Sequence, residues 1–187
     1  AKITKNVRII LQFDGVGKTT AIKKLANDLS SKGVQAGGFY TEEVRDGGNS
    51  RVGFDVITFE GKRDKLARTR DSSEGDIRRP MVGKYSVYVN EFEKISLQVL
   101  GQQTSVLIID EIGKMELLSK NFEQKIKQLI PQIRSGKLKV VATIPCRHTS
   151  KLIEEIKSLP NAKLFEITKA NRNNCYEDIK KLKTIKQ

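Results

Sequence analysis

Short apolar runs alternate with helical patterns along most of the chain. Residues 7–11 form a β-branched run suited to a buried strand, and the apolar spacing after them changes to that of one helix face. This face comprises Ile22, Leu25, Ala26 and Leu29. We expect the helix to span 19–32 and to end at Gly33, because glycine readily takes the left-handed conformation that follows many helices. The chain therefore opens with a predicted strand, loop and helix.

The same alternation continues toward the end of the sequence. Further buried strands are predicted at 106–109, 138–144 and 163–167. Helices are predicted from four apolar faces: Phe92, Ile95, Val99 and Leu100; Phe122, Ile126, Leu129, Ile130 and Ile133; Leu152, Ile153 and Ile156; Tyr176, Ile179 and Leu182. Asn90 with Glu93 resembles a capping pair for the first of these helices. Pro131 is expected to end or kink the second helix near Ile130.

The middle of the chain has a different pattern. Residues 37–40 and 52–59 look extended, and the Asp-Gly-Gly-Asn sequence at 46–49 between them is typical of a turn. We expect an antiparallel hairpin here, followed by a charged surface loop at 61–80 and extended chain at 85–89. Alternating strands and helices favour a doubly wound sheet. We therefore predict a single α/β domain over 1–187, with three layers, a mainly parallel central sheet, helices on both faces and an inserted antiparallel hairpin.

Composition narrows the class of protein. The 187 residues are 37% apolar and 30% charged, which excludes a wholly disordered or collagen-like chain. The longest apolar runs are far shorter than the roughly 20 residues that span a membrane. One histidine and two distant cysteines argue against a zinc site and against a serine-type triad, which only His148 would complete. We expect a cytoplasmic monomer without a membrane segment.

The charge balance points toward polyanions. The 35 Lys and Arg residues exceed the 22 Asp and Glu residues, giving a net charge of +13. Such an excess attracts phosphates, so nonspecific contact with nucleic acid is expected. The basic residues are dispersed over the N-terminal third, the segment 62–84 and the C-terminus, so no single stripe marks a binding face. A solvated surface remains the simpler interpretation.

The first turn between strand and helix contains a phosphate-binding pattern. Residues 12–20 read Gln-Phe-Asp-Gly-Val-Gly-Lys-Thr-Thr, which matches G-x-x-x-x-G-K-[ST] except at its first glycine. Between a strand and a helix start, backbone amides and the positive helix end converge on an anion. Lys18 is expected to reach the β and γ phosphates, and the Thr19 hydroxyl to ligate Mg²⁺. The residues predicted to bind nucleotide here are Gly15, Val16, Gly17, Lys18, Thr19 and Thr20.

A second pattern ends the predicted strand 106–109, where Asp110 and Glu111 follow four apolar residues. Ligands of open α/β sheets lie at the carboxyl ends of the strands. Asp110 is therefore expected to hold Mg²⁺ through water, and Glu111 to orient and deprotonate the attacking water. An acidic pair can also simply cap the next element. The two patterns reinforce each other because together they supply both halves of a phosphoryl-transfer site.

The chain resembles the cancer-related nucleoside-triphosphatases and their thermophilic bacterial and archaeal relatives, which are small P-loop proteins of about this length. Besides the phosphate-binding pattern, the resemblance rests on the segments 38–45, 52–56, 83–85, 109–116 and 168–173. It implies a P-loop NTPase fold and Mg²⁺-dependent hydrolysis of nucleoside 5′-triphosphates to diphosphate and phosphate. It also implies that Lys114 supplies charge like an internal arginine finger, and that Asn171 and Arg172 border the base.

The loop departs from the family pattern at two positions. The family usually begins this loop with Gly-x-Pro-Gly, whereas this chain has Gln12-Phe13-Asp14-Gly15. A carboxylate at Asp14 that pointed inward, at about 6 Å from a phosphate, would cost roughly 3 kcal/mol per unit charge at an effective dielectric near 20. An outward carboxylate would cost much less, and the sequence leaves both orientations open.

Two other functions use the same residues. A nucleotide or small-molecule kinase needs the same phosphate-binding apparatus, with 62–84 as a basic lid, and would release little free phosphate without an acceptor. A noncatalytic protein with a degenerate loop would bind nucleotide or nucleic acid, with strongly salt-dependent affinity for nucleic acid and no turnover. The sequence alone favours hydrolysis over both.

Overall fold

Nine strands form one mixed sheet in the described part of the protein. The computed structural model describes residues 8–13, 18–70, 78–145, 150–160, 162–168 and 170–171, with only the backbone of 8–13 and 18. The strands are β1 (Arg8–Phe13), β2 (Ala36–Arg45), β3 (Arg51–Thr58), β4 (Arg63–Thr69), β5 (Met81–Val82), β6 (Tyr85–Val87), β7 (Val106–Ile109), β8 (Lys139–Pro145) and β9 (Ala162–Ile167). Their order in the sheet is β5-β6-β4-β3-β2-β7-β8-β1-β9.

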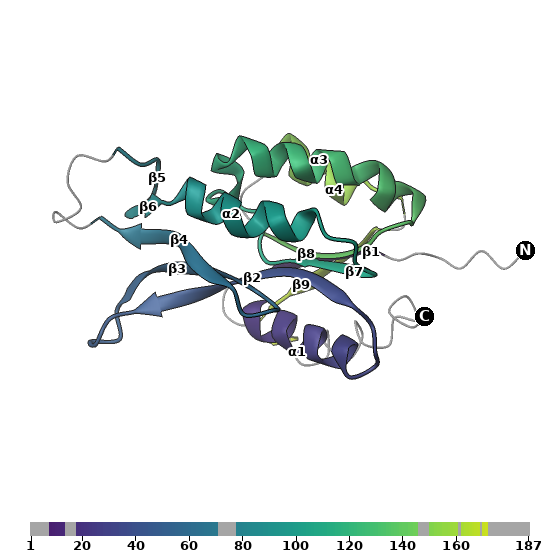
Figure 1. The fold of residues 1–187 in the computed structure, drawn as a ribbon, viewed down its shortest axis with the longest axis horizontal. Helices are drawn as coiled ribbons and strands as arrows, with labels where there is room; N and C mark the ends of the chain where they lie inside the picture. Colours follow the sequence, from purple (N-terminus) through teal and green to yellow (C-terminus); the bar gives the residue numbers. More distant parts are fainter. Residues whose placement is uncertain are drawn as a thin grey trace, which may run out of the picture.

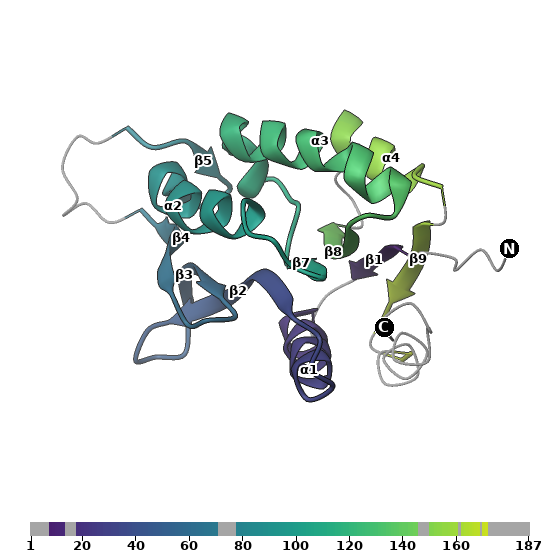
Figure 2. The same cartoon turned by 45° about the vertical axis from the view of Figure 1, so that its right-hand side comes forward.

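Helices cover both faces of this sheet. They are α1 (Lys18–Ser30), α2 (Val89–Leu100), α3 (Lys120–Ser135) and α4 (Lys151–Lys157). Figure 1 shows α2, α3 and α4 above the sheet and α1 below it, and Figure 2 shows the strands between these two helical layers. The predicted three-layer α/β fold is confirmed. None of the helices in the described ranges is long and apolar enough to cross a membrane.

The parallel half of the sheet contains β2, β7, β8, β1 and β9, each paired in parallel with its neighbour. All four residues of β7 are buried, as expected for a strand covered by helices on both faces. The larger core cluster lies between the sheet and α2, α3 and α4, and a smaller one surrounds Ile22, Leu25 and Leu29 of α1. The apolar runs and helix faces of the sequence therefore form the interior.

The antiparallel half is larger than one hairpin. β2 and β3 pair in antiparallel fashion, and β4, β6 and β5 continue the sheet beyond β3 in the same manner. The prediction of a surface loop at 61–80 is wrong for the first part of that segment, because residues 63–69 form β4. Leu66 and Ala67 of this strand are buried against the core, and the charged residues around them point away from it or form ion pairs.

A predicted helix cap and a predicted helix end also differ from the structure. α2 begins at Val89 with no capping side chain, and Glu93 instead accepts hydrogen bonds from Ser119 and Asn121. α3 continues through Pro131 as far as Ser135, since core packing of the apolar residues on both sides of the proline keeps the last turn helical. The predicted helix at 176–182, together with His148, lies outside the described residues.

Candidate active site

Asp110 lies at the centre of the candidate site, directly after β7. Its side chain is 1% exposed. The hydroxyl of Thr143 on β8 donates to Asp110 Oδ1 at 2.6 Å, and the hydroxyl of Thr19 donates to Asp110 Oδ2 at 3.2 Å. The Asp110 backbone N–H donates to the carbonyl of Phe39 on β2 at 3.1 Å. Two strands and a helix start therefore fix one buried carboxylate.

Thr19 brings the start of α1 to this carboxylate. Its hydroxyl group lies 3.0 Å from the carbonyl oxygen of Thr41 on β2 as well as close to Asp110. β1 ends at Phe13 and α1 begins at Lys18, so the predicted strand and helix stand on either side of the phosphate-binding pattern. Residues 14–17, which include Gly15, Val16 and Gly17, and the side chain of Lys18 lie outside the description. Their predicted contacts with phosphate stay predictions.

Glu111 faces the same cleft as Asp110. The loop that follows is held at Ile112, whose N–H donates to the carbonyl of Thr143 at 2.9 Å. The cleft has a volume of about 850 Å³. The described residues that line it are Thr19, Thr20, Lys23, Thr41, Glu42, Glu43, Arg45, Arg51, Phe54, Leu66, Val82, Asp110, Glu111, Lys114, Met115, Glu116 and Pro145. Thr19, Thr20, Asp110, Glu111 and Lys114 are thus brought together, as their predicted roles require.

The cleft extends along the antiparallel strands. β2 runs past the end of β7, because its pairing with β7 stops at Phe39 whereas the strand continues to Arg45. Glu43 on this extension accepts from Arg45 at 2.5 Å and from Arg51 at 2.6 Å. Arg51 also lies over the ring of Phe54, with 5.4 Å between the guanidinium carbon and the ring centroid. One wall of the cleft is therefore polar, with an aromatic ring at its base.

A pair of opposite charges ties α1 to β2 beside the site. Lys23 Nζ lies 2.6 Å from Glu42 Oε1 and 4.4 Å from the centre of the Tyr40 ring. The hydrogen bond from Lys23 lowers the pKa of the Glu42 carboxyl, and the same bond raises the pKa of Lys23. Arg63 on β4 is a second partner of Glu42. These contacts hold the antiparallel strands against the helix that begins at the phosphate-binding pattern.

Glu116 is a buried acidic residue of the same site. It is 5% exposed, and its Oε2 accepts from the backbone N–H of Gly113 at 3.1 Å. Burial is the main cause that raises the pKa of this carboxyl group to about 8, and the neighbouring Glu111 charge acts in the same direction. Glu116 is therefore a neutral acid at pH 7, next to the predicted water-orienting residue.

Asn171 lies apart from the carboxylates, in the turn after β9. Its Oδ1 accepts from the N–H of Thr168 at 2.8 Å, and its Nδ2 donates to the carbonyl of Glu166 at 2.9 Å. Both ends of its amide thus bind the turn, and Asn171 is absent from the cleft lining given above. Because β9 is next to β1, the turn lies at the same edge of the sheet as the phosphate-binding pattern. Arg172 falls outside the described residues.

Sequence reasoning missed two residues of this site. Thr143 lies inside what reads as an apolar run at 140–144, where a single polar residue near the carboxyl end of a buried strand is a usable signal. Glu116 belongs to a segment that supports the family resemblance, but its burial depends on how the loop after Glu111 folds back. The course of this loop does not follow from the spacing of residues in the sequence.

Comparison with known proteins connects this geometry to a family. The family model described as NTPase matches residues 10–180. The chain is 42% identical over 174 residues to the human cancer-related nucleoside-triphosphatase, covering 88% of this chain and 90% of that protein. It is 41% identical over 180 residues to the nucleoside-triphosphatase THEP1 of Aquifex aeolicus, covering 91% and 95%.

Two solved structures have the same fold. The crystal structure of THEP1 from Aquifex aeolicus superposes with a TM-score of 0.76 at 39% identity, covering 96% of this chain and 99% of that chain. The solution structure of a human cancer-related nucleoside triphosphatase gives a TM-score of 0.79 at 39% identity, covering 97% and 99%. Similarity in sequence and in structure therefore extends over nearly the whole length of each protein.

Proposed function

The chain belongs to the NTPase family of nucleoside-triphosphate hydrolases, and from this we propose that it hydrolyses nucleoside 5′-triphosphates, ATP and GTP among them, with Mg²⁺. The products are the nucleoside diphosphate and inorganic phosphate. The observation that supports the proposal best is the contact of 3.2 Å between Thr19 Oγ1 and Asp110 Oδ2. This contact joins the helix after the phosphate-binding pattern to the acidic end of β7, as phosphoryl transfer requires.

The donor atoms present suit Mg²⁺. This ion takes oxygen ligands, and nucleotide-hydrolysing sites commonly hold it through one or two protein oxygens, with phosphates and water completing the shell. The Thr19 hydroxyl and the Asp110 carboxylate are oxygen donors of this kind, and they lie side by side. Bound there, Mg²⁺ would offset the negative charge of the phosphates.

The chain's own residues divide the remaining work. The amides of 15–17 and the Lys18 ammonium bind the phosphates, and Lys114 adds positive charge from the opposite side of the cleft. Glu111 orients a water molecule and accepts its proton as the water oxygen bonds to the γ phosphorus. The bond from that phosphorus to the bridging oxygen breaks, and the diphosphate leaves with the bridging oxygen.

Phosphate release tests the proposal directly. The protein is incubated with Mg²⁺ and each nucleoside triphosphate in turn, and free phosphate is measured, with EDTA and the Lys18→Ala variant as controls. We expect release that requires Mg²⁺ and is lost with Lys18→Ala. Equal release by this variant would mean that the phosphate-binding pattern is not the site of turnover.

Glu111→Gln should separate binding from chemistry. The amide keeps the size of the side chain but accepts no proton, so kcat should fall by about 10² to 10⁴ while nucleotide affinity changes little. Turnover and the dissociation constant of the nucleotide are measured together. Glu154→Gln, the same exchange on the exposed surface of α4, is the matched control. Normal turnover by Glu111→Gln would remove Glu111 from the role of base.

A phosphotransferase is the second candidate, because the cleft extends past Glu111 along the antiparallel strands to Arg45, Arg51 and Phe54. That space lies on the far side of the site from the turn after β9, where the base is expected. An acceptor molecule bound there would receive the γ phosphoryl group in place of water. A kinase would release very little phosphate without an acceptor, so the assay above distinguishes the two reactions.

A further inference from the structure

Gly113 separates two carboxyl groups in the loop after β7. A Cβ atom built on Gly113 would lie 2.5 Å from Oε1 of Glu111 and 3.0 Å from Oε2 of Glu116. Both distances are shorter than ordinary contacts, so a side chain at 113 would require the carboxyl ends of Glu111 and Glu116 to shift. The loop therefore folds with Glu111 and Glu116 on the same side of Gly113.

The hydrogen bonds to the Glu116 carboxyl group come from backbone N–H groups, those of Gly113 and of Glu116 itself. Its contact with the Gly113 N–H fixes Oε2, and no Lys or Arg among the described residues forms an ion pair with it. Asp55, another buried acidic residue, differs in this respect because Arg68 and Arg63 both pair with it. A buried carboxyl group without a cation is costly as an anion and is usually a neutral acid.

The charged groups around Glu116 are mainly acidic. Glu111 and Asp110 face it from the end of β7, and both raise its pKa. Lys114 on the same loop lines the cleft. On the helices packed against this loop, Glu93 of α2 binds Ser119 and Asn121, and Glu123 of α3 pairs with Lys120 and Lys127. Lys120 and Lys127 pair with Glu123 rather than with Glu116.

We propose that Glu116 is a positioning residue for Glu111: buried and bonded to the Gly113 N–H, it closes the loop across Gly113 and keeps the Glu111 carboxylate directed into the cleft. This inference rests on the proposed hydrolysis for its kinetic consequence. An ionised Glu116 would repel Glu111 across the space that Gly113 leaves.

Replacements of Glu116 separate its shape from its charge. In Glu116→Gln the side-chain carbonyl can still accept from the Gly113 N–H, and the group stays neutral at every pH. In Glu116→Ala the contact is lost and the loop is no longer closed. Because Glu116 ionises near pH 8 in the parent protein, turnover of the parent should fall as the pH rises through this value.

The test is the pH profile of kcat and KM between about pH 6 and 9 for the parent and both variants. We expect Glu116→Gln to keep kcat at pH 7 within about threefold and to lose the fall near pH 8. We expect Glu116→Ala to lower kcat about tenfold or more, with nucleotide affinity unchanged. An unchanged kcat in Glu116→Ala, or the same alkaline fall in Glu116→Gln, would overturn the proposal.

Gly113→Ala gives an independent measurement. Its Cβ would displace the Glu111 carboxylate, and a misplacement of about 1 Å can cost roughly a hundredfold in rate. Gly47→Ala is the matched control, because a Cβ at Gly47 meets nothing within 4 Å. We expect Gly113→Ala to lower kcat strongly with nucleotide binding retained. A Gly113→Ala enzyme as active as Gly47→Ala would show that the position of Glu111 does not depend on this loop.

Infrared spectroscopy keeps this inference distinct from the proposed hydrolysis. The parent protein should show a protonated carboxyl band that titrates near pH 8, and Glu116→Gln should lack it. If the parent protein showed this band but released no phosphate, the proposed hydrolysis would be rejected. The neutral Glu116 beside Glu111 would still be established. Absence of the band from the parent would overturn the positioning role, whatever the turnover.

Discussion

At the scale of single residues, the site depends on hydrogen bonds to one buried carboxylate. Asp110 accepts from two threonine hydroxyls that come from positions far apart in the sequence. A buried carboxylate needs such donors, because its desolvation is otherwise uncompensated. The Thr19 hydroxyl therefore has a structural role even without metal, and the Thr143 hydroxyl holds Asp110 in place.

Thr143→Val tests this role of the hydroxyl. Valine has nearly the shape of threonine but no donor, so Asp110 Oδ1 would lose this hydrogen bond. We expect the free energy of unfolding to fall by about 2 kcal/mol, measured by chemical denaturation. Thr143→Ser is the control, because it keeps the donor and removes a methyl group. A Val variant as stable as the Ser variant would mean that this hydrogen bond contributes little.

The residues that could be predicted at this scale stand at sharp changes of pattern. Asp110 and Glu111 follow four apolar residues, and Thr19 follows a glycine-containing turn and a lysine. Thr143 and Glu116 stand at no such boundary. Thr143 was hidden in a buried strand, and the burial of Glu116 results from a loop that folds back onto Glu111. Such contacts depend on tertiary structure, which local pattern does not contain.

At the scale of elements, strands of the parallel half were predictable and β4 was not. The parallel strands are buried on both faces and read as continuous apolar runs. β4 contains Arg63, Asp64, Lys65 and Arg68 around only two buried residues, so its composition resembles a loop. Its charged side chains are accommodated because Glu42 and Asp55 on neighbouring strands pair with them. A strand whose charges are neutralised by other strands cannot be recognised from its own residues.

The contact between β2 and β7 predicts the effect of one glycine. Gly38 has φ of +126°, and a Cβ there would lie 1.8 Å from the carbonyl oxygen of Ile108 on β7. Gly38→Ala should therefore force β2 away from β7, and we expect a loss of more than about 3 kcal/mol in the free energy of unfolding.

Gly37→Ala is the matched control for this measurement by thermal or chemical denaturation. A Cβ at Gly37 would meet only the side chain of Thr104, at 3.3 Å, and this side chain is able to shift. Its loss should stay within about 1 kcal/mol. If both variants lost the same stability, the close approach of Gly38 to Ile108 would not be what joins these strands.

At the scale of the whole molecule, the cleft lies where the two halves of the sheet meet. The parallel half supplies Asp110 and Glu111, and the antiparallel half supplies the wall that contains Glu43, Arg45 and Arg51. The sequence predicts the strands of the first half and much of its chemistry, since β1 and β7 each end in a recognisable motif. It predicts only one hairpin of the second half, so the wall that the antiparallel strands give the cleft is known only from the structure.

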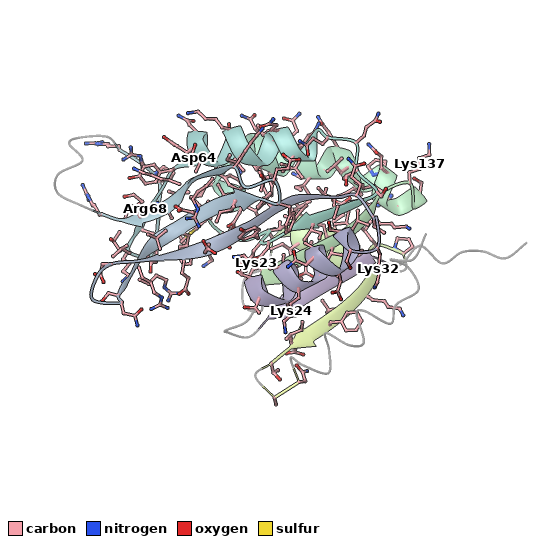
Figure 3. The ribbon with its side chains drawn as sticks, turned by 60° about the horizontal axis from the view of Figure 1, so that its bottom comes forward. Lys23, Lys24, Lys32, Asp64, Arg68 and Lys137 are labelled. Atoms are coloured by element: carbon pink, nitrogen blue, oxygen red, sulfur yellow. The ribbon has the colours of Figure 1, made fainter. Side chains whose placement is uncertain are left out.

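The surface charge of the whole molecule makes a last prediction. The net charge is +13, and the basic side chains labelled in Figure 3 come from separate places: Lys23 and Lys24 on α1, Lys32 in the turn after it, Arg68 on β4, and Lys137 after α3. We propose weak contact with nucleic acid that does not depend on sequence. Because such contact releases counterions, affinity for single-stranded RNA should fall about fiftyfold from about 50 to about 200 mM salt, if roughly four phosphates are neutralised.

Fluorescence anisotropy of a labelled oligonucleotide measures this dependence, and single substitutions test how it is distributed. Since the charges are spread over separate elements, Lys32→Ala or Lys137→Ala alone should weaken binding by no more than about threefold, close to the effect of one phosphate contact. Affinity that survived the rise in salt would require a specific site rather than a diffuse field. A large loss from one of these substitutions would place that site on the element that contains it.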